Sequence, residues 1–239
     1  IPLCQITKIP IFLKITMGKQ ILHIGIDDTD SAKGMCTTFL VYKIIDRLKK
    51  EKVVFLDFPN LIRFNPNIPW KTRGNGAVSL KISTENPTKI KNLVKQYVKK
   101  YSDVKNGANP GLVFCQTENI PQAFIKLSSD AMWKLIHRNE AKKILSKHDI
   151  DFFYLGNGQG LVGATSIIGY TFDDQTYELL SYRKPSQFGK KRTLDKSKVK
   201  QMQEKTYPDT FNSYDSKKNK LLLMPHGPDP VFFGVRGEN

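Results

Sequence analysis

Apolar and polar residues alternate in the first well-patterned segment of the chain, residues 20–27. Leu22, Ile24 and Ile26 lie on one side of an extended chain, and His23 and Gly25 lie on the other. This period of two predicts a β-strand with one face on a hydrophobic core.

Apolar residues at helical spacing predict two helices in the first half of the chain, over residues 35–50 and 87–101. Pro87 suits the first turn of the second helix, where a missing N–H costs nothing. Further strands are predicted over residues 52–58, 77–83 and 112–115. The order from residue 20 to 115 is therefore βαββαβ, the split βαβ arrangement of ferredoxin-like domains.

The second half of the chain has weaker patterns, and the boundary between the halves is set only by the change in pattern. We expect a helix over 130–147 with Trp133 facing inward, a Gly-rich turn over 156–160, a Lys-rich helix over 194–206, and strands over 176–182 and 231–236. These elements predict an α+β fold with mixed or antiparallel sheets and helices on one face. The expected parts are an extension (1–16), a first domain (17–127) and a second α+β domain (128–239).

Three carboxylates follow the first strand within four positions: Asp27, Asp28 and Asp30. Like charges at this spacing raise each other's pKa values unless a cation neutralises them. Mg²⁺ takes hard oxygen ligands and also binds nucleotide phosphates. We therefore predict that the three residues are metal ligands and catalytic groups. The alternative is a turn that caps the next helix, which explains one Asp but not three.

Lys33 and Gly34 form a predicted turn before a helix whose N-terminus carries Cys36 and Thr37. Free N–H groups and the helix dipole attract phosphate at such a position, so we expect Lys33 and Gly34 to contact a nucleotide. A hydroxyl there, such as that of Thr37, can accept a phosphoryl group. The sequence contains no GxxxxGK[ST] motif, so this nucleotide site is not a P-loop.

The predicted long loop over residues 61–77 combines Trp70 with Lys71 and Arg73. Lys and Arg can pair with phosphate, and Trp can stack on a nucleobase. The alternative is a solvated loop with its Trp in the core.

Two segments of the second half are weaker candidates. Successive N–H groups in a Gly-rich turn can converge on an anion, although most such turns are only turns; the residues concerned are Gly156, Asn157, Gly158 and Gly160. A segment stiffened by three prolines carries the candidate catalytic residues His226, Asp229 and Arg236. A structural role for these three residues is the alternative.

Composition narrows the class of partner. The 239 residues include 38 Lys and Arg against 22 Asp and Glu, a net charge of +16. This surplus favours a polyanion such as RNA. Apolar residues make up 39%, too many for a disordered chain, and no apolar run reaches the roughly 18–20 residues of a membrane span. Three cysteines without a CxxC pair indicate neither a disulfide framework nor a cysteine zinc site, and they favour the cytoplasm.

Six segments together resemble the archaeal tRNA 2-agmatinylcytidine synthetase family: IGIDDTDSAKGMCTT, RFNPNIPWKTRGNGA, GANPG, GNGQGLVGA, YELLSYR and PHGPDPVFFGVRGE. The resemblance implies an ATP-dependent ligase that modifies the wobble cytidine of the isoleucine tRNA that reads AUA. ATP phosphorylates the C2 oxygen of this cytidine, and agmatine then displaces the phosphate to give agmatidine. ATP ends as AMP and inorganic phosphate.

The resemblance also implies roles for domains and residues. The family has a kinase-type α/β domain, a ferredoxin-like domain, an OB-fold and a zinc ribbon. Only the first two are expected in these 239 residues: the kinase-type domain that binds ATP and Mg²⁺ over 17–127, and the ferredoxin-like domain over 128–239. Asp27, Asp28 and Asp30 would bind Mg²⁺ with the ATP phosphates, and Thr37 matches an autophosphorylated threonine. One family motif, KTRGNG, contains Lys71 and Arg73. Another contains His226, Asp229 and Arg236, and the resemblance implies that this second motif lies near ATP.

Two other functions remain compatible with the residues. An Asp-x-Asp sequence after a strand is typical of haloacid-dehalogenase-like Mg²⁺-dependent phosphotransferases, which use an Asp nucleophile. A non-catalytic RNA-binding module would explain the charge and the βαββαβ order without any ATP turnover. Covalent labelling by ATP would distinguish the three.

Overall fold

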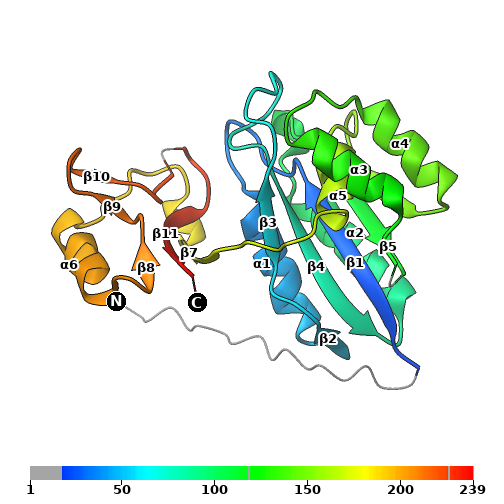
Figure 1. Ribbon diagram of the computed structural model, residues 1–239, viewed down its shortest axis with the longest axis horizontal. Helices are drawn as coiled ribbons and strands as arrows, with labels where there is room; N and C mark the ends of the chain where they lie inside the picture. Colours follow the sequence, from blue (N-terminus) through cyan, green and yellow to red (C-terminus); the bar gives the residue numbers. More distant parts are fainter. Residues whose placement is uncertain (1–17, 118, 226, 239) are drawn as a thin grey trace. The chain divides into compact units, whose positions relative to one another are not determined.

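The computed structural model describes residues 18–117, 119–225 and 227–238, and these form two compact units (Figure 1). The larger unit ends at Thr171 and the smaller begins at Phe172. The predicted N-terminal extension, residues 1–16, lies outside the described residues.

The larger unit is built on a six-stranded antiparallel sheet. Its strands are β1 (Gln20–Asp27), β2 (Val53–Phe55), β3 (Asn60–Arg63), β4 (Gly76–Thr84), β5 (Gly111–Cys115) and β6 (Asp151–Tyr154). The order is β2-β4-β1-β5-β6, and β3 also pairs with β4. The path β2-β4-β1-β5, with its two intervening helices, is the predicted split βαβ arrangement, which is thereby confirmed. The strands β3 and β6 are additions that the sequence pattern did not reveal.

One face of this sheet is covered by α1 (Thr37–Leu48) and α2 (Pro87–Tyr101), both close to their predicted ranges. Leu22, Ile24 and Ile26 of β1 are fully buried there, in one continuous cluster with apolar residues of both helices. The spacing of apolar residues was sufficient to predict these elements because each has a single buried stripe.

The opposite face is also covered, by α5 (Leu161–Ile168), whereas the sequence predicted helices on one face only. A Cβ atom on Gly25 would lie 1.9 Å from the carbonyl oxygen of Ala164, so the backbone of α5 lies directly on β1. His23 is on this second face. Burial and the nearby Lys81 lower its pKa to about 4.

The helix predicted over 130–147 is two helices, α3 (Gln122–Ala131) and α4 (Arg138–Lys147). The carbonyl of Ala131 accepts a hydrogen bond from the N–H of Asn65, at 3.1 Å, instead of continuing the helix. Trp133 lies in the break and is 66% exposed, so the prediction that it faces inward was wrong.

The boundary between the units lies after residue 171, not near residue 127 as the sequence suggested. The reason is the packing of α5 on β1 and of α3 and α4 on α5, which makes residues 122–168 part of the larger unit. A 3-10 turn, η1 (Val104–Asn106), also belongs to this unit.

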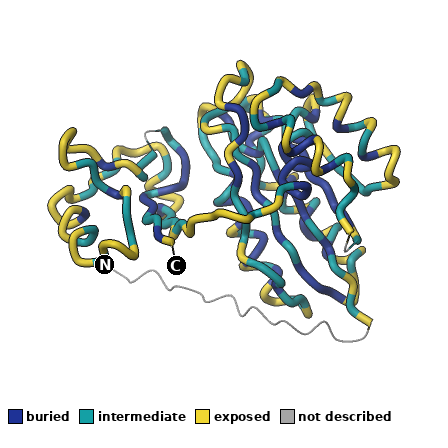
Figure 2. Tube along the Cα trace, viewed as in Figure 1, coloured by how far each residue is buried: buried dark blue, intermediate teal, exposed yellow. Residues whose placement is uncertain are grey.

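The smaller unit contains a three-stranded antiparallel sheet of order β7-β11-β8. Its elements are β7 (Tyr177–Tyr182), η2 (Pro185–Gln187), α6 (Lys196–Thr206), β8 (Thr210–Phe211), β9 (Tyr214–Asp215), β10 (Lys220–Leu221) and β11 (Val231–Gly237). The predictions of β7, α6 and β11 are confirmed. Its core is small, with Val199, Leu221 and Phe233 buried, and Figure 2 shows far less buried chain here than in the larger unit.

None of the helices that the structure describes combines the length and the apolar character needed to cross a membrane.

Candidate active site

The predicted acidic cluster lies at the end of β1, in a segment that we call the acidic loop (residues 27–34). Asp28 has a φ of 55°, a left-handed conformation that ends the strand. Oδ1 of Asp27 accepts a hydrogen bond of 2.6 Å from the N–H of Asp28. Burial, followed by the charge of Asp28, raises the pKa of Asp27 well above its usual range. Burial and the charge of Asp30 raise the pKa of Asp28 to about 7. Both carboxylates therefore favour a nearby cation.

Asp30 has a different environment, because Arg73 donates hydrogen bonds to its Oδ2 from Nη2 and, at 2.9 Å, from Nε. Arg73 also donates to the carbonyl of Met35, and the adjacent Thr72 donates to Oδ1 of Asp28 at 3.4 Å. Arg73 thus joins the loop after β3 to the acidic loop, a contact that the sequence did not suggest, whereas Lys71 is exposed. That Lys71 and Arg73 bind phosphate stays a prediction.

Thr37 is the first residue of α1 and lies beside the acidic loop. Its Oγ1 donates to Oδ1 of Asp30 at 3.4 Å and accepts from Oγ1 of Thr29 at 3.1 Å. The residue is only 5% exposed, and no side chain caps the N-terminus of α1. A hydroxyl, a carboxylate that accepts its hydrogen bond and a helix N-terminus that favours anions therefore meet at one point.

Asp103 anchors the acidic loop through hydrogen bonds to two of its residues. Its Oδ2 accepts a 2.6 Å hydrogen bond from the hydroxyl of Ser31, and its N–H donates to the carbonyl of Thr29. Within the loop, Ser31 and Gly34 pair through their backbones in a tight turn, and Lys33 is exposed at its tip. The turn that the sequence predicted is present, and it presents Lys33 to solvent.

The Gly-rich segment lies against the acidic loop, although 130 residues separate them in the sequence. A Cβ on Gly160 would lie 2.6 Å from the carbonyl oxygen of Asp27, and one on Gly163 would lie 2.0 Å from its Oδ2. The N–H groups of residues 157–160 all donate to protein acceptors. Gly156, Gly158 and Gly160 thus pack closely against neighbouring segments. That these glycines and Asn157 bind an anion stays a prediction.

Asn109 and Thr72 are contacts that sequence reasoning missed. The Asn109 backbone N–H bonds to the Asp28 carboxylate, which opposes the rise in the pKa of that group, and Oδ1 of Asn109 accepts from the N–H of Asn157 at 3.0 Å. Both residues stand in segments noted for their resemblance, GANPG and KTRGNG, so the signal was present. What the sequence did not reveal is that they touch the acidic loop.

The candidates of the smaller unit have partners within that unit. Oδ1 of the buried Asp229 accepts from the N–H of Val231 at 2.9 Å and from Nη2 of Arg192 at 3.1 Å. Arg236 donates to Oε1 of Glu178, from Nε at 3.1 Å. His226 lies outside the described residues. That these residues act near ATP stays a prediction.

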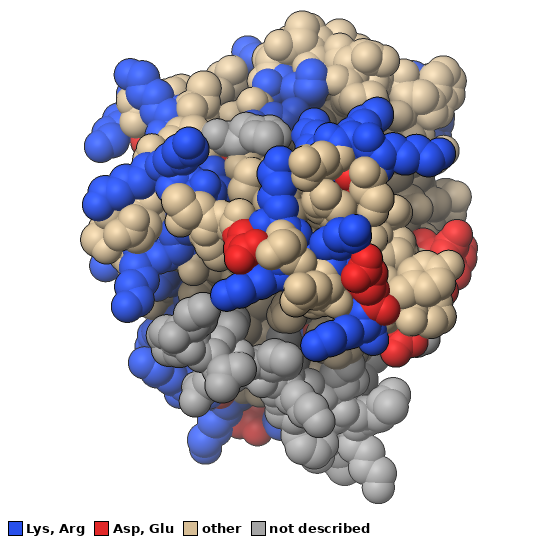
Figure 3. Space-filling model, turned by 90° about the vertical axis from the view of Figure 1, so that its left-hand side faces the viewer, with Lys and Arg blue, Asp and Glu red and all other residues tan. Residues whose placement is uncertain are grey.

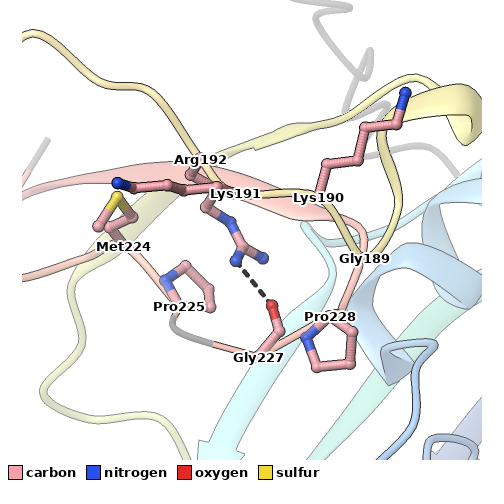
Figure 4. A pocket seen from close by; sticks show the side chains of 8 residues that line it. All are labelled: Gly189, Lys190, Lys191, Arg192, Met224, Pro225, Gly227 and Pro228. Atoms are coloured by element: carbon pink, nitrogen blue, oxygen red, sulfur yellow. Dashed lines mark hydrogen bonds between the residues drawn. The ribbon is translucent and has the colours of Figure 1, made fainter.

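A cavity of about 430 Å³ in the smaller unit adjoins the same segment (Figure 4). It is lined by Gly189, Lys190, Lys191, Arg192, Met224, Pro225, Gly227 and Pro228. Arg192 closes one side through a 2.7 Å hydrogen bond to the carbonyl of Gly227, drawn as a dashed line in the figure.

On the face of the molecule seen in Figure 3, Lys and Arg side chains are widespread and acidic ones are few.

Within the described ranges, no group of three or more His, Cys, Asp or Glu side chains is arranged to hold a metal ion. Asp30 is engaged by Arg73, which leaves Asp27 and Asp28 as carboxylates in need of a cation. Two carboxylates still fit Mg²⁺, which commonly takes one or two from the protein and completes its shell with water and phosphate oxygens.

Comparison with known proteins matches two parts of the chain to family models: residues 23–93 to the TiaS TCKD domain and residues 158–239 to the TiaS FLD domain. The tRNA 2-agmatinylcytidine synthetase TiaS of Cenarchaeum symbiosum is 48% identical over 91% of this chain. That of Pyrococcus horikoshii is 42% identical, also over 91%. The chain belongs to the TiaS family.

Solved TiaS structures agree. A crystal structure of a TiaS–tRNA–ATP complex is matched over 92% of this chain with a TM-score of 0.87 and 34% identity. A TiaS–tRNA–AMPCPP–agmatine complex is matched over 92% with a TM-score of 0.85 and 32% identity. The chain spans 53% and 54% of those two chains, and 48% and 52% of the two relatives named above.

The first matched domain, residues 23–93, contains the acidic loop, Thr37 and Arg73. The second matched domain begins at residue 158, inside the larger compact unit. The TiaS domain border and the division into compact units thus differ by residues 158–171, which include α5.

Proposed function

We propose that this chain is the part of an agmatidine-forming TiaS enzyme that binds ATP and activates the wobble cytidine of the AUA-reading isoleucine tRNA. Agmatine would then displace the phosphate, making the whole protein an ATP-dependent C–N ligase. The proposal rests above all on the meeting of Asp27, Asp28, Asp30 and Thr37 at one end of β1. The relatives' names and the tRNA, ATP and agmatine complexes of related proteins support it. A tRNA-modifying role also favours the cytoplasm.

The chemistry requires a good leaving group. Oxygen leaves the C2 position of cytidine poorly, and phosphorylation converts it into phosphate, which leaves readily. Phosphoryl transfer in turn depends on positioning and on neutralising charge. A Mg²⁺ ion held by Asp27 and Asp28 would supply that neutralisation for the ATP phosphates.

Asp30 and Arg73 have a separate role in this proposal. Arg73 holds the carboxylate of Asp30 in place, and that carboxylate accepts the hydrogen bond of the Thr37 hydroxyl. Asp30 can therefore take the Thr37 proton when the hydroxyl oxygen bonds to the γ-phosphorus of ATP, while the bond from that phosphorus to the β,γ-bridging oxygen breaks and ADP leaves. Because Thr37 is buried, this transfer requires the acidic loop to open.

The test is covalent labelling of the purified chain by ATP that carries a labelled γ-phosphate. The wild-type chain should retain label after denaturation, and Thr37→Ala should lose it. Thr38→Ala is the matched control, because this hydroxyl is one residue further along α1 and bonds to Cys36 rather than to Asp30. Label that persists in Thr37→Ala and disappears in Asp28→Asn would assign the site to an aspartyl phosphotransferase. No label and no Mg²⁺-dependent ATP turnover in the wild type would leave RNA binding as the function.

A further inference from the structure

The chain has two tryptophans, and both are on the surface: Trp70 is 46% exposed and Trp133 is 66% exposed. An indole exposed to this degree forgoes much of the stabilisation that its burial would provide. Each of the two is followed directly by a lysine, Lys71 or Lys134. An exposed indole followed by a lysine therefore recurs at two places far apart in the sequence, and at Trp133 the lysine lies over the ring.

The segments that carry these tryptophans are joined. The N–H of Asn65 donates to the carbonyl of Ala131 at 3.1 Å, two residues before Trp133. Asn75 donates from Nδ2 to the carbonyl of Asn65 at 2.7 Å, which fixes the base of the loop that carries Trp70. The same loop brings Arg73 to the acidic loop. The segment that carries Trp133 is thus hydrogen-bonded to the loop that supplies Arg73 to the candidate active site.

The ring of Trp133 is held in an electropositive setting. Nζ of Lys134 lies 4.4 Å from the ring centroid and 2.7 Å from Oδ1 of Asp130. Lys126 pairs with the other carboxylate oxygen of Asp130 at 3.0 Å. Two lysines therefore face one aspartate, and the surface around the exposed indole remains positive.

We propose that Trp133, with Lys134, is a stacking site for an unpaired nucleobase of the RNA that the candidate active site acts on. The inference rests on the proposed function for the identity of that RNA. An enzyme that reacts with a base must take it out of the stack, which leaves neighbouring bases exposed. An aromatic ring replaces the lost stacking, and an adjacent cation pairs with the phosphate.

The charge argues for RNA rather than protein as the occupant. The chain carries a net charge of +16, and the one acidic side chain among these contacts, Asp130, is already paired with two lysines. A protein partner would use the whole apolar patch, including Leu135, which is 55% exposed. A nucleobase needs only the flat ring.

Intrinsic fluorescence tests the proposal directly, because Trp70→Phe leaves Trp133 as the single tryptophan, and its emission is isolated from that of the nine tyrosines by excitation at a wavelength that only indole absorbs. The probes are a stem-loop RNA with the anticodon loop of the isoleucine tRNA and a blunt duplex of the same stem. Stacking on a base quenches indole emission, so the stem-loop should quench Trp133 and the duplex should not.

Binding of the same two RNAs to variants of the otherwise wild-type chain gives the second readout. We expect Trp133→Ala to weaken stem-loop binding about 10-fold and to leave duplex binding unchanged. Trp133→Phe should recover part of the loss. Leu135→Ala is the matched control, because it removes exposed apolar surface two residues away without removing a ring, and it should bind as the wild type does.

Each alternative result counts against the stacking site. Unchanged emission together with wild-type affinity of Trp133→Ala would overturn it while leaving the proposed function intact. Equal losses in Trp133→Ala and Leu135→Ala would indicate a general apolar contact instead of stacking. If the wild-type chain binds neither RNA, the stacking site is refuted, and the labelling of Thr37 still judges the proposed function separately.

Discussion

Each unit encloses an aspartate next to a turn of the backbone, and the two carboxylates have contrasting neighbours. Asp27 in the larger unit has Asp28 and Asp30 beside it, and its pKa is raised. Asp229 in the smaller unit accepts hydrogen bonds from Arg192 and from the N–H of Val231. Asp27 therefore lies among like charges, whereas Asp229 has a cationic partner within its own unit.

The difference in cores explains why the larger unit can tolerate such a site. Its apolar cluster runs continuously from β1 through α1 and α2. The smaller unit buries few apolar side chains, and guanidinium groups hold its loops instead: Arg183 donates to the carbonyls of Lys190 and Asp229, and Arg192 donates to those of Gly227, Asp229 and Val231. A large core can offset a destabilised active site. A small one depends on satisfying its buried polar groups.

The largest effect should come from Arg192→Ala. It removes the charge partner of the buried Asp229 and several carbonyl hydrogen bonds, so the smaller unit should lose about 3–5 kcal/mol of stability. Amide hydrogen exchange in β7 and β11 measures this loss for the smaller unit alone. Lys200→Ala, which breaks an exposed pair with Glu204, is the control and should cost less than about 0.5 kcal/mol. Unchanged protection in Arg192→Ala would show that guanidinium contacts do not hold this unit.

A glycine within a strand of each unit gives the second comparison. Gly25→Ala would press a methyl group into the backbone of α5, and we expect it to cost the larger unit about 3 kcal/mol. Gly234→Ala in β11 would meet its first neighbour at 3.1 Å, the flexible end of Leu180, and should cost less than about 1 kcal/mol. Urea denaturation followed by tryptophan emission reports on the larger unit, and hydrogen exchange reports on the smaller. Similar costs at both sites would mean that α5 can move away from β1.

The smallest effect should be a gain in stability, from Asp28→Asn. A carboxyl with a raised pKa binds its proton more tightly in the folded state, so its contribution to stability falls as pH rises from about 4 to about 7. Asn cannot ionise and accepts the left-handed φ, so the variant should match the wild type near pH 4 and exceed it by about 1–2 kcal/mol at pH 8.

Asp30→Asn is the matched control for this last prediction. It removes the charge that Arg73 binds, so it should destabilise the larger unit at pH 8. His23, whose pKa is lowered, adds the same pH dependence to every variant and cancels in the differences. A gain in both variants, or in neither, would contradict the separate roles that we assign to Asp28 and Asp30.

The sequence by itself determined the elements whose pattern has one buried stripe. The strand over residues 20–27, the helix that begins at Pro87 and the split βαβ order follow from local spacing, because side-chain direction repeats with a fixed period. The acidic cluster and Thr37 could also be predicted. Three carboxylates this close in the sequence repel one another in any fold, and a hydroxyl at the start of a helix lies where phosphate binds. The family motifs added the expected reaction, the 2-agmatinylcytidine synthesis for which the relatives are named.

Tertiary structure alone decided which distant groups meet. Arg73 binds Asp30, Asn109 binds Asp28, and Gly163 leaves room for the carboxylate of Asp27, although these residues are up to 136 positions apart in the sequence. The break after α3, next to the exposed Trp133, coincides with a hydrogen bond between Ala131 and Asn65, which no helical pattern encodes. The periodic pattern of a helix or strand shows only which of its side chains are buried. These contacts depend instead on how a second element, distant in the sequence, is placed against the first.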